Sequence, residues 1–303
     1  MEYLRFGNRM TSRIALGCMR ISQLSPVEVD HLVHTALDHG ICFFDHADIY
    51  GGGKSEEKFG ILLKEEPSLR ENMFLQSKTS IREGMYDCSG EYIIASVEKS
   101  LERLHTDHLD CLLLHRPDAL MEPQEVKEAF DQLEQSGKVL QFGFSNMNRY
   151  QMELLAASVS QKPAVSQFQM SIVHCPGIES GINVNLMNDA ALMREAGTME
   201  YCRMNDMVMQ AWSPLQKGFF QGVFLEDEEY PRLNEVLQDL ADRYGTSKDT
   251  IAYAWVLRCP GKVQCIAGTT RPDRLIHAAE AVKIRLSRKE WYDLYLAAGR
   301  TLP

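Results

Sequence analysis

The sequence lacks the features that mark membrane proteins and nucleic-acid-binding proteins. No apolar run approaches the roughly 20 residues that a membrane-spanning helix requires. The first residues, MEYLRFGNRMTSR, contain no apolar segment typical of a secretory signal. The formal net charge is −10, with no long run of one sign, which argues against a nucleic-acid or anionic-membrane partner. We therefore expect a soluble, cytoplasmic protein with neither kind of partner.

Cysteine motifs are missing as well. The eight cysteines form no CxxC pair, and Cys42, Cys111 and Cys265 lie inside apolar, strand-like runs. Disulfide frameworks and zinc sites depend on clustered or regularly spaced cysteines. The sequence therefore predicts buried, reduced thiols in a reducing compartment and no bound metal.

What the chain does contain is a regular alternation of apolar strands and amphipathic helices. A short hairpin is predicted over residues 3–11, with a turn at Gly7-Asn8. Eight strands are predicted at residues 13–19, 41–44, 73–78, 109–115, 139–144, 164–170, 207–212 and 263–267. Helices are predicted at residues 26–39, 55–63, 91–104, 123–135, 149–157, 247–259, 271–282 and 289–298, the second of them capped by Ser55.

This alternation predicts the α/β class with a parallel sheet. Eight units in 303 residues fit a closed (β/α)₈ TIM barrel with an N-terminal β-hairpin, folded as one domain over residues 1–303. A doubly wound open sheet is the alternative. It would usually carry a GxGxxG turn after its first strand, whereas this chain reads Gly17-Cys18-Met19-Arg20 there.

Two long segments interrupt the repeat. Residues 171–188 follow the sixth strand and residues 216–229 follow the seventh, so both belong to the C-terminal face of the barrel. Long loops in a compact domain are usually functional lids, and a tolerated surface insertion is the alternative for each.

Four chemically active side chains come at or just after the ends of consecutive strands. Asp45 ends the second strand and Tyr50 follows it on a glycine-rich loop, while Lys78 and His115 end the third and fourth strands. Catalytic groups of a TIM barrel lie at these ends, so we expect the four to share one pocket. Taken singly, each could be an ordinary hydrogen-bonded residue, and His115 could belong to the core.

Together the four suit the protonation of a carbonyl oxygen. A tyrosine has a pKa of about 10, and a nearby ammonium such as Lys78 would lower it. Asp45 could hold Lys78 charged, and His115 could orient the carbonyl by a hydrogen bond. The set contains no serine or cysteine nucleophile with a paired base.

A metal-dependent hydrolase is a weaker alternative. His46 and Asp48 resemble half of a metal site in barrel hydrolases, but no second cluster of histidine and carboxylate follows them.

Several longer motifs carry a family resemblance. They are FFDHADIYGGGKSEEKFG (43–60), SKT (77–79), LDCLLLHRPD (109–118), GKVLQFGFSN (137–146), AWSPL (211–215) and IAGTTRPDRL (266–275). In this order they resemble the aldo-keto reductases, and the DHADIYGG and HRPD forms are most similar to the YdhF-type branch of bacterial predicted oxidoreductases. The resemblance implies an NADPH-dependent enzyme that reduces small aldehydes or ketones to alcohols, with Tyr50 as the proton donor.

The resemblance also implies where the cofactor lies. Ser145, Asn146 and Gln167 would hydrogen-bond the nicotinamide carboxamide, and Trp212 would stack on the ring. The other implied contacts are Gly17, Cys18, Met19, Asp45, Ser213, Leu215, Gly268, Thr269, Thr270, Arg271 and Arg274.

One departure from the family bears on the cofactor. Gly268 stands where many members carry a lysine for the 2′-phosphate. Because Arg271 and Arg274 can supply positive charge there, NADPH is expected, and NADH is the alternative. A further alternative is a cofactor-sensing module resembling the potassium-channel β-subunits, although no channel-docking segment is evident.

Overall fold

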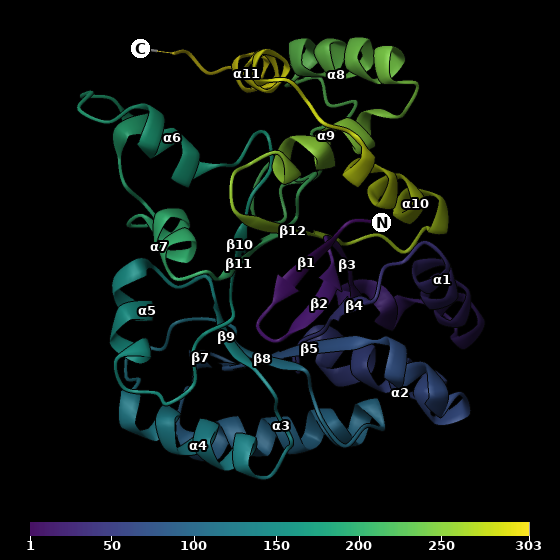
Figure 1. Cartoon of the computed structure of the whole chain (residues 1–303), viewed down its shortest axis with the longest axis vertical. Coiled ribbons are helices and arrows are strands. Elements are labelled where there is room, and N and C mark those ends of the chain that lie inside the picture. Colours follow the sequence, from purple (N-terminus) through teal and green to yellow (C-terminus); the bar gives the residue numbers. More distant parts are fainter. Residues whose placement is uncertain (303) are drawn as a thin grey trace.

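Eight parallel strands close into a barrel in the computed structural model, which describes residues 1–302 (Figure 1). In ring order the strands are β10 (Val165–Gln169), β11 (Val208–Trp212), β12 (Lys262–Ala267), β3 (Ile14–Gly17), β4 (Phe43–Asp45), β5 (Phe74–Thr79), β8 (Cys111–Leu114) and β9 (Phe142–Ser145). The pairing of β12 with β3 and of β9 with β10 closes the ring. The predicted (β/α)₈ barrel is confirmed, and the open-sheet alternative is wrong.

Helices surround this barrel, and all eight predicted helices are present. They are α1 (Pro26–Asp38), α2 (Lys54–Glu65), α3 (Gly90–Leu104), α4 (Pro123–Gln135), α5 (Arg149–Ala156), α9 (Lys248–Leu257), α10 (Pro272–Glu280) and α11 (Arg288–Ala297). Three more were not predicted: α6 (Pro176–Ile182), α7 (Thr198–Met204) and α8 (Pro231–Tyr244). None of the helices in residues 1–302 has the length and apolar character that a membrane span requires.

The start of α2 differs from the prediction. Ser55 does not cap this helix, because its hydroxyl donates to the carbonyl oxygen of Met19 at 3.1 Å. The helix begins one residue earlier, after Gly53, which has the left-handed φ of 93°. A side chain is disfavoured at such a φ, so the glycine makes this sharp entry into the helix possible.

An N-terminal hairpin lies across the barrel, as predicted. Its strands are β1 (Tyr3–Phe6) and β2 (Arg9–Ser12). Phe6 is fully buried against Phe43 and Phe74, with ring centroids 5.4 and 4.9 Å away. These two phenylalanines start β4 and β5, so the hairpin closes the N-terminal end of the barrel and leaves its C-terminal end for a site.

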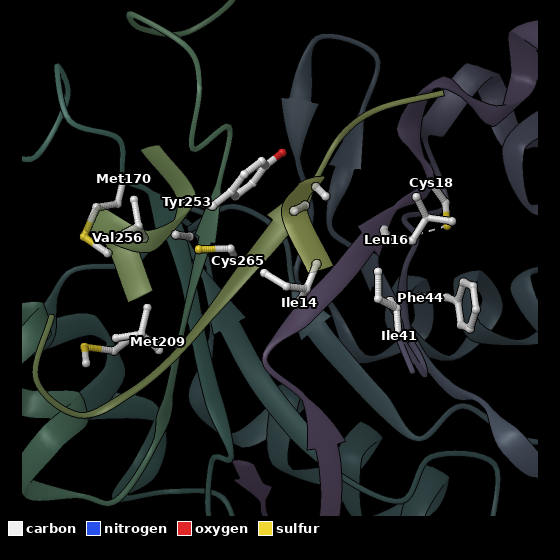
Figure 2. Close-up of a cluster of buried hydrophobic side chains, with 14 of the residues drawn as sticks. Ile14, Leu16, Cys18, Ile41, Phe44, Met170, Met209, Tyr253, Val256 and Cys265 are labelled. Atoms are coloured by element: carbon white, nitrogen blue, oxygen red, sulfur yellow. Dashed lines mark hydrogen bonds between the residues drawn. The ribbon is translucent and has the colours of Figure 1, made fainter. Parts of the chain in front are cut away.

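The strands bury both of their faces, which explains their nearly continuous apolar sequences. Inward-facing residues such as Phe43, Phe74 and Val165 form one cluster inside the barrel. The outward-facing ones pack beneath the helices, and Figure 2 shows part of this outer core, with Leu16 near Phe44 and other side chains from β12 and α9.

The two long segments differ from each other. Residues 171–188 contain α6 and are therefore not structureless. Residues 216–229 contain no helix or strand, and an isolated bridge pairs Gln216 with Val223. A small hairpin that was not predicted, β6 (Ile81–Arg82) with β7 (Met85–Tyr86), follows β5.

The packing of α2 on α3 yields a stability prediction. A Cβ at Gly60 of α2 would lie 1.9 Å from the backbone oxygen of Arg103 in α3. Alanine usually stabilises a helix relative to glycine by about 1 kcal/mol, but here we expect Gly60→Ala to lower the free energy of unfolding by about 1–3 kcal/mol. Urea denaturation measures the change.

Gly181 provides a matched control, because it lies in α6 and a Cβ there would meet nothing within 4 Å. Gly181→Ala should be neutral or stabilising. A Gly60→Ala protein as stable as the wild type would contradict the close packing of these two helices.

Candidate active site

The buried ammonium of Lys78 is the centre of the site. Lys78 lies near the end of β5 and its side chain is fully buried. Its Nζ lies 2.7 Å from Asp45 Oδ1 and 2.7 Å from the backbone oxygen of His46, and it donates to the Tyr50 hydroxyl at 3.0 Å. These three acceptors match the three protons of an ammonium group. The expectation that Asp45, Lys78 and Tyr50 lie together is met by this geometry.

The glycine triplet positions Tyr50. The chain turns back directly after Tyr50, because Gly51 and Gly52 have left-handed φ values of 62° and 67°. The turn brings the tyrosine ring to 4.8 Å from Lys78 Nζ, measured to the ring centroid. The glycine-rich loop therefore serves to fold the phenol onto the ammonium.

The acidity of the Tyr50 phenol differs in part from the expectation that Lys78 would lower its pKa. Burial raises the pKa of Tyr50, and the charge of Lys78 opposes this shift without cancelling it. Burial also disfavours the ammonium of Lys78, but Asp45 and Tyr50 outweigh it, so the pKa of Lys78 is raised. Lys78 does act in the predicted direction, but the net pKa of Tyr50 lies above its ordinary value because burial disfavours the phenolate more.

His115 joins this group from the end of β8. Its ring lies edge-on to Tyr50, with centroids 5.9 Å apart, and its backbone N–H donates to the oxygen of Thr79 at 2.7 Å. Burial, followed by the charges of Lys78 and Arg116, holds the pKa of His115 well below its usual value. A neutral imidazole carries one N–H donor and one acceptor, so His115 can donate one hydrogen bond at neutral pH.

The predicted nicotinamide contacts are already bonded to one another. Asn146 accepts from Trp212 Nε1 at 3.0 Å and donates to Ser145 Oγ at 2.9 Å and to the oxygen of His115 at 3.2 Å. Gln167 donates to Asp45 Oδ1 at 3.0 Å. Asn146 thus links β9, the β8 end and the tryptophan of β11, and this network sets the orientation of the indole.

Two of the predicted cofactor contacts have a left-handed backbone. Asn146 and Ser213 have φ values of 56° and 51°, in a region that residues with a side chain seldom adopt. Strain of this kind often occurs at functional sites. Both residues directly follow a barrel strand and both were predicted to contact the cofactor.

After β12, the strand next to β11, the predicted phosphate contacts are only partly free. Arg271 is held by Asp273, with 2.5 Å between Nη2 and Oδ2, and both side chains are exposed. Within residues 1–302, Arg274 forms no ion pair. Arg20 was not predicted for this side, yet its guanidinium donates to the oxygen of Gly268 at 2.9 Å.

The remaining predicted contacts differ in how accessible they are. Thr269 and Thr270 are half-buried in the turn before α10, where Thr269 Oγ1 accepts from the backbone N–H of Arg271 at 3.1 Å. Gly17, Met19 and Leu215 are also half-buried. The side chain of Cys18 is fully buried in the outer core (Figure 2), which leaves only its backbone for the predicted contact.

His46 and Asp48 contact different partners. The His46 ring lies edge-on to Phe59 with centroids 4.6 Å apart, and burial lowers the pKa of His46 to about 3. Asp48 accepts from Ser96 Oγ at 2.7 Å. Within residues 1–302, the potential ligands that lie close enough to share a metal ion are the partly exposed Asp30, His34 and Glu66.

Sequence reasoning missed a group of buried amides beneath the site. Gln76, Gln210 and Gln264 lie inside the barrel and are completely buried. Gln76 comes two residues before Lys78, and Gln210 comes two residues before Trp212. Because side chains alternate along a strand, this spacing places Gln76 and Gln210 on the same inward face as a site residue, and it was a usable signal.

Comparison with known proteins agrees with this architecture. The model of the aldo/keto reductase family matches residues 13–295. The oxidoreductase YdhF of Escherichia coli is 36% identical, with 95% of this chain and 93% of the relative covered. A 6-dehydroglucose reductase of Agrobacterium fabrum is 34% identical, with 95% of each chain covered. An aldo-keto reductase of Klebsiella pneumoniae, solved in complex with NADPH, superposes with a TM-score of 0.78 at 25% identity, over 97% of this chain and 93% of the other.

The closed barrel and the match to the family model place the chain among the barrel oxidoreductases. The chain belongs to the aldo/keto reductase family, and it is an NAD(P)H-dependent oxidoreductase. The resemblance noted in its motifs is thereby confirmed.

The buried histidine yields a prediction on acid stability. The pKa of His46 is about 3 in the folded chain, below the ordinary value of 6.5, so between these values the unfolded chain binds the extra proton. Stability is therefore lost as the pH falls below 6.5. One such histidine contributes up to about 1.4 kcal/mol per pH unit to this loss.

We expect His46→Leu to flatten this dependence, because leucine keeps an apolar contact with Phe59 and cannot be protonated. Urea unfolding of both proteins at pH 5 and pH 7 measures it. Equal losses in the two proteins would show that His46 is not the source.

Proposed function

We propose that this protein reduces aldehydes or ketones to alcohols with NADPH, and that Tyr50 is the proton donor. The observation that carries the proposal is the contact of Lys78 with both Asp45 and Tyr50 in a buried site. A phenol beside a fixed ammonium can release its proton, because the phenolate left behind is stabilised by the positive charge. The set contains no serine or cysteine nucleophile with a paired base.

The proposed step assigns each side chain one task. His115, neutral at working pH, donates a hydrogen bond to the substrate carbonyl oxygen and holds it beside Tyr50. NADPH supplies the hydride that reaches the carbonyl carbon. Tyr50 gives its hydroxyl proton to the carbonyl oxygen, Lys78 stabilises the resulting phenolate, and solvent then returns the proton. The carbonyl thus gains a hydride and a proton and leaves as an alcohol.

The residues expected to hold the cofactor suit a dinucleotide. Trp212 offers an indole face at the rim, fixed by Asn146, on which a nicotinamide ring can stack. The N-terminus of α10 attracts an anionic phosphate, and Arg20 and Arg274 add positive charge near it. Arg271 would have to exchange Asp273 for a phosphate, and the exposed pair can do so at low cost.

The substrate class can be narrowed by the relatives. Two relatives that are 33–34% identical over most of this chain are named as 6-dehydroglucose reductases. A small, polar aldehyde such as 6-dehydroglucose is therefore a reasonable first substrate to assay. The expected cytoplasmic location stays a prediction.

Tyr50→Phe tests the proton donor. Phenylalanine keeps the ring and removes the acidic proton, so we expect kcat for NADPH-dependent aldehyde reduction to fall by at least about 100-fold, the usual contribution of a general acid. NADPH affinity, measured by quenching of tryptophan fluorescence, should be unchanged.

Tyr92→Phe is the matched control. The Tyr92 hydroxyl lies 3.4 Å from Asp48 and 3.3 Å from the oxygen of Ile81, away from Lys78, so this variant should keep most of the activity. Full activity in Tyr50→Phe would exclude the phenol as the acid.

The preference for NADPH over NADH tests the contacts predicted for the phosphate on the adenosine. We expect NADPH to bind more tightly than NADH, and Arg274→Ala to weaken NADPH binding by about 10-fold or more, the effect of losing one charge-assisted hydrogen bond. NADH binding should change little, because it has no 2′-phosphate. Equal weakening for both cofactors would place Arg274 away from that phosphate.

A further inference from the structure

A layer of amide side chains crosses the interior of the barrel between its apolar floor and its charged rim. The layer consists of Gln76, Gln167, Gln210 and Gln264, from β5, β10, β11 and β12, and each is at most 2% exposed. Below it lie the stacked rings of the floor, and above it lies the Asp45–Lys78 pair. A barrel interior is usually filled by branched apolar side chains, so four glutamines at one level require an explanation.

The amides form one continuous set of hydrogen bonds. Gln264 donates to the backbone oxygen of Ser12 at 2.6 Å and accepts from Gln210 at 2.7 Å. The side-chain oxygen of Gln210 in turn accepts from Gln76 and from Gln167, both at 2.9 Å. The network therefore runs from the hairpin at the closed end of the barrel to the level of the site.

The network ends on the carboxylate of the site. Asp45 Oδ1 accepts from Gln76 Nε2 at 2.7 Å and from Gln167 Nε2 at 3.0 Å, and Lys78 lies 2.7 Å from the same oxygen. Both protons of the Gln76 amide are thus committed, one to Asp45 and one to Gln210. Gln76 and Asp45 are also direct neighbours in the register of β4 and β5.

We propose that Gln76 is a positioning residue for the proton donor. Its amide, held in place by Gln210, fixes Asp45 Oδ1, which holds Lys78 against Tyr50. This inference rests on the proposed function, since it assigns Gln76 a task in setting up the same acid. Gln76 acts through Asp45 and Lys78 and does not itself reach the substrate.

Stability alone does not account for Gln76. Its side-chain oxygen is buried and has no hydrogen-bond partner within residues 1–302. A buried acceptor without a partner is destabilising, and an apolar side chain of similar size avoids that cost. What an apolar side chain cannot supply is a donor to Asp45.

Gln76→Met tests the proposal, because methionine has a similar length and cannot donate. We expect kcat for NADPH-dependent reduction of para-nitrobenzaldehyde to fall by about tenfold, the effect of one hydrogen bond to a charged group. The Kd for NADPH should stay nearly unchanged, because no predicted cofactor contact is removed.

Gln264→Met is the matched control. It removes the same chemical group from the same layer, but Gln264 is separated from Asp45 by Gln210 and one further amide. This variant should lose thermal stability and keep its kcat. An unchanged kcat in Gln76→Met, or an equal loss in Gln264→Met, would overturn the positioning role.

The pH dependence of kcat in Gln76→Glu is a further test, because a purely structural role of Gln76 would not change it. A carboxyl group at this position can donate to Asp45 only when protonated, so its kcat relative to the wild type should rise as the pH is lowered from 8 to 5. The other ionisable groups facing Asp45 are Lys78, Tyr50 and two thiols. Burial raises the pKa of Cys18 and Cys111 well above its ordinary value, so neither thiol titrates in this range.

If Gln76→Met does not fold, Gln76→Glu still tests the proposal. A relative kcat that stays constant with pH would overturn the proposal. The same measurements distinguish a failure of the proposed function from a failure of the role assigned to Gln76. A wild-type chain that reduces no carbonyl with NADPH would refute the proposed function and this inference with it. An active wild type with a fully active Gln76→Met variant would refute only the role of Gln76.

Discussion

The structure of the site depends on one constraint, the burial of a charged ammonium. Lys78 is completely enclosed, and a buried charge is tolerated only when it is paired and its protons are hydrogen-bonded. Asp45, Tyr50 and the backbone of His46 meet this need. Their positions follow from it: β4 must end beside β5, and the loop after β4 must fold back over Lys78. The proposed acid is therefore as fixed as the ion pair beneath it.

The interior of the barrel supports this pair in layers. The hairpin fills the closed end with Phe6, whose ring packs on Phe43 and Phe74. The glutamines lie above these rings, where Gln76 and Gln167 donate to Asp45, and the ionisable groups form the top layer. Polarity thus increases from floor to rim.

Much of this could be predicted from the sequence, because strand ends are visible as abrupt changes from apolar to polar residues. That pattern placed Asp45, Lys78 and His115 on one rim before any contact was known. The prediction failed where signals were short or overridden, and it also passed over α8, whose fourteen residues carry a regular amphipathic pattern. Helix α6 is seven residues long and interrupted by Gly177 and Gly181, so no periodicity could emerge. Ser55 looked like a cap, but its hydroxyl bonds across space to Met19. The alternation along β5 and β11 indicated that Gln76 and Gln210 face the interior, but the hydrogen bonds that join four glutamines from four strands are tertiary contacts that no local pattern encodes.

The most direct test of the central claim is the pH dependence of carbonyl reduction in Lys78→Met. Under the proposed mechanism reduction requires a protonated Tyr50, so kcat/KM should fall as the pH rises through the pKa of Tyr50. Without the ammonium that opposes the upward shift of this pKa, the phenol should be a weaker acid. We therefore predict that kcat/KM of Lys78→Met has a lower plateau than that of the wild type and declines at a higher pH. NADPH binding should stay nearly intact. A variant with the plateau and the alkaline decline of the wild type would contradict the account.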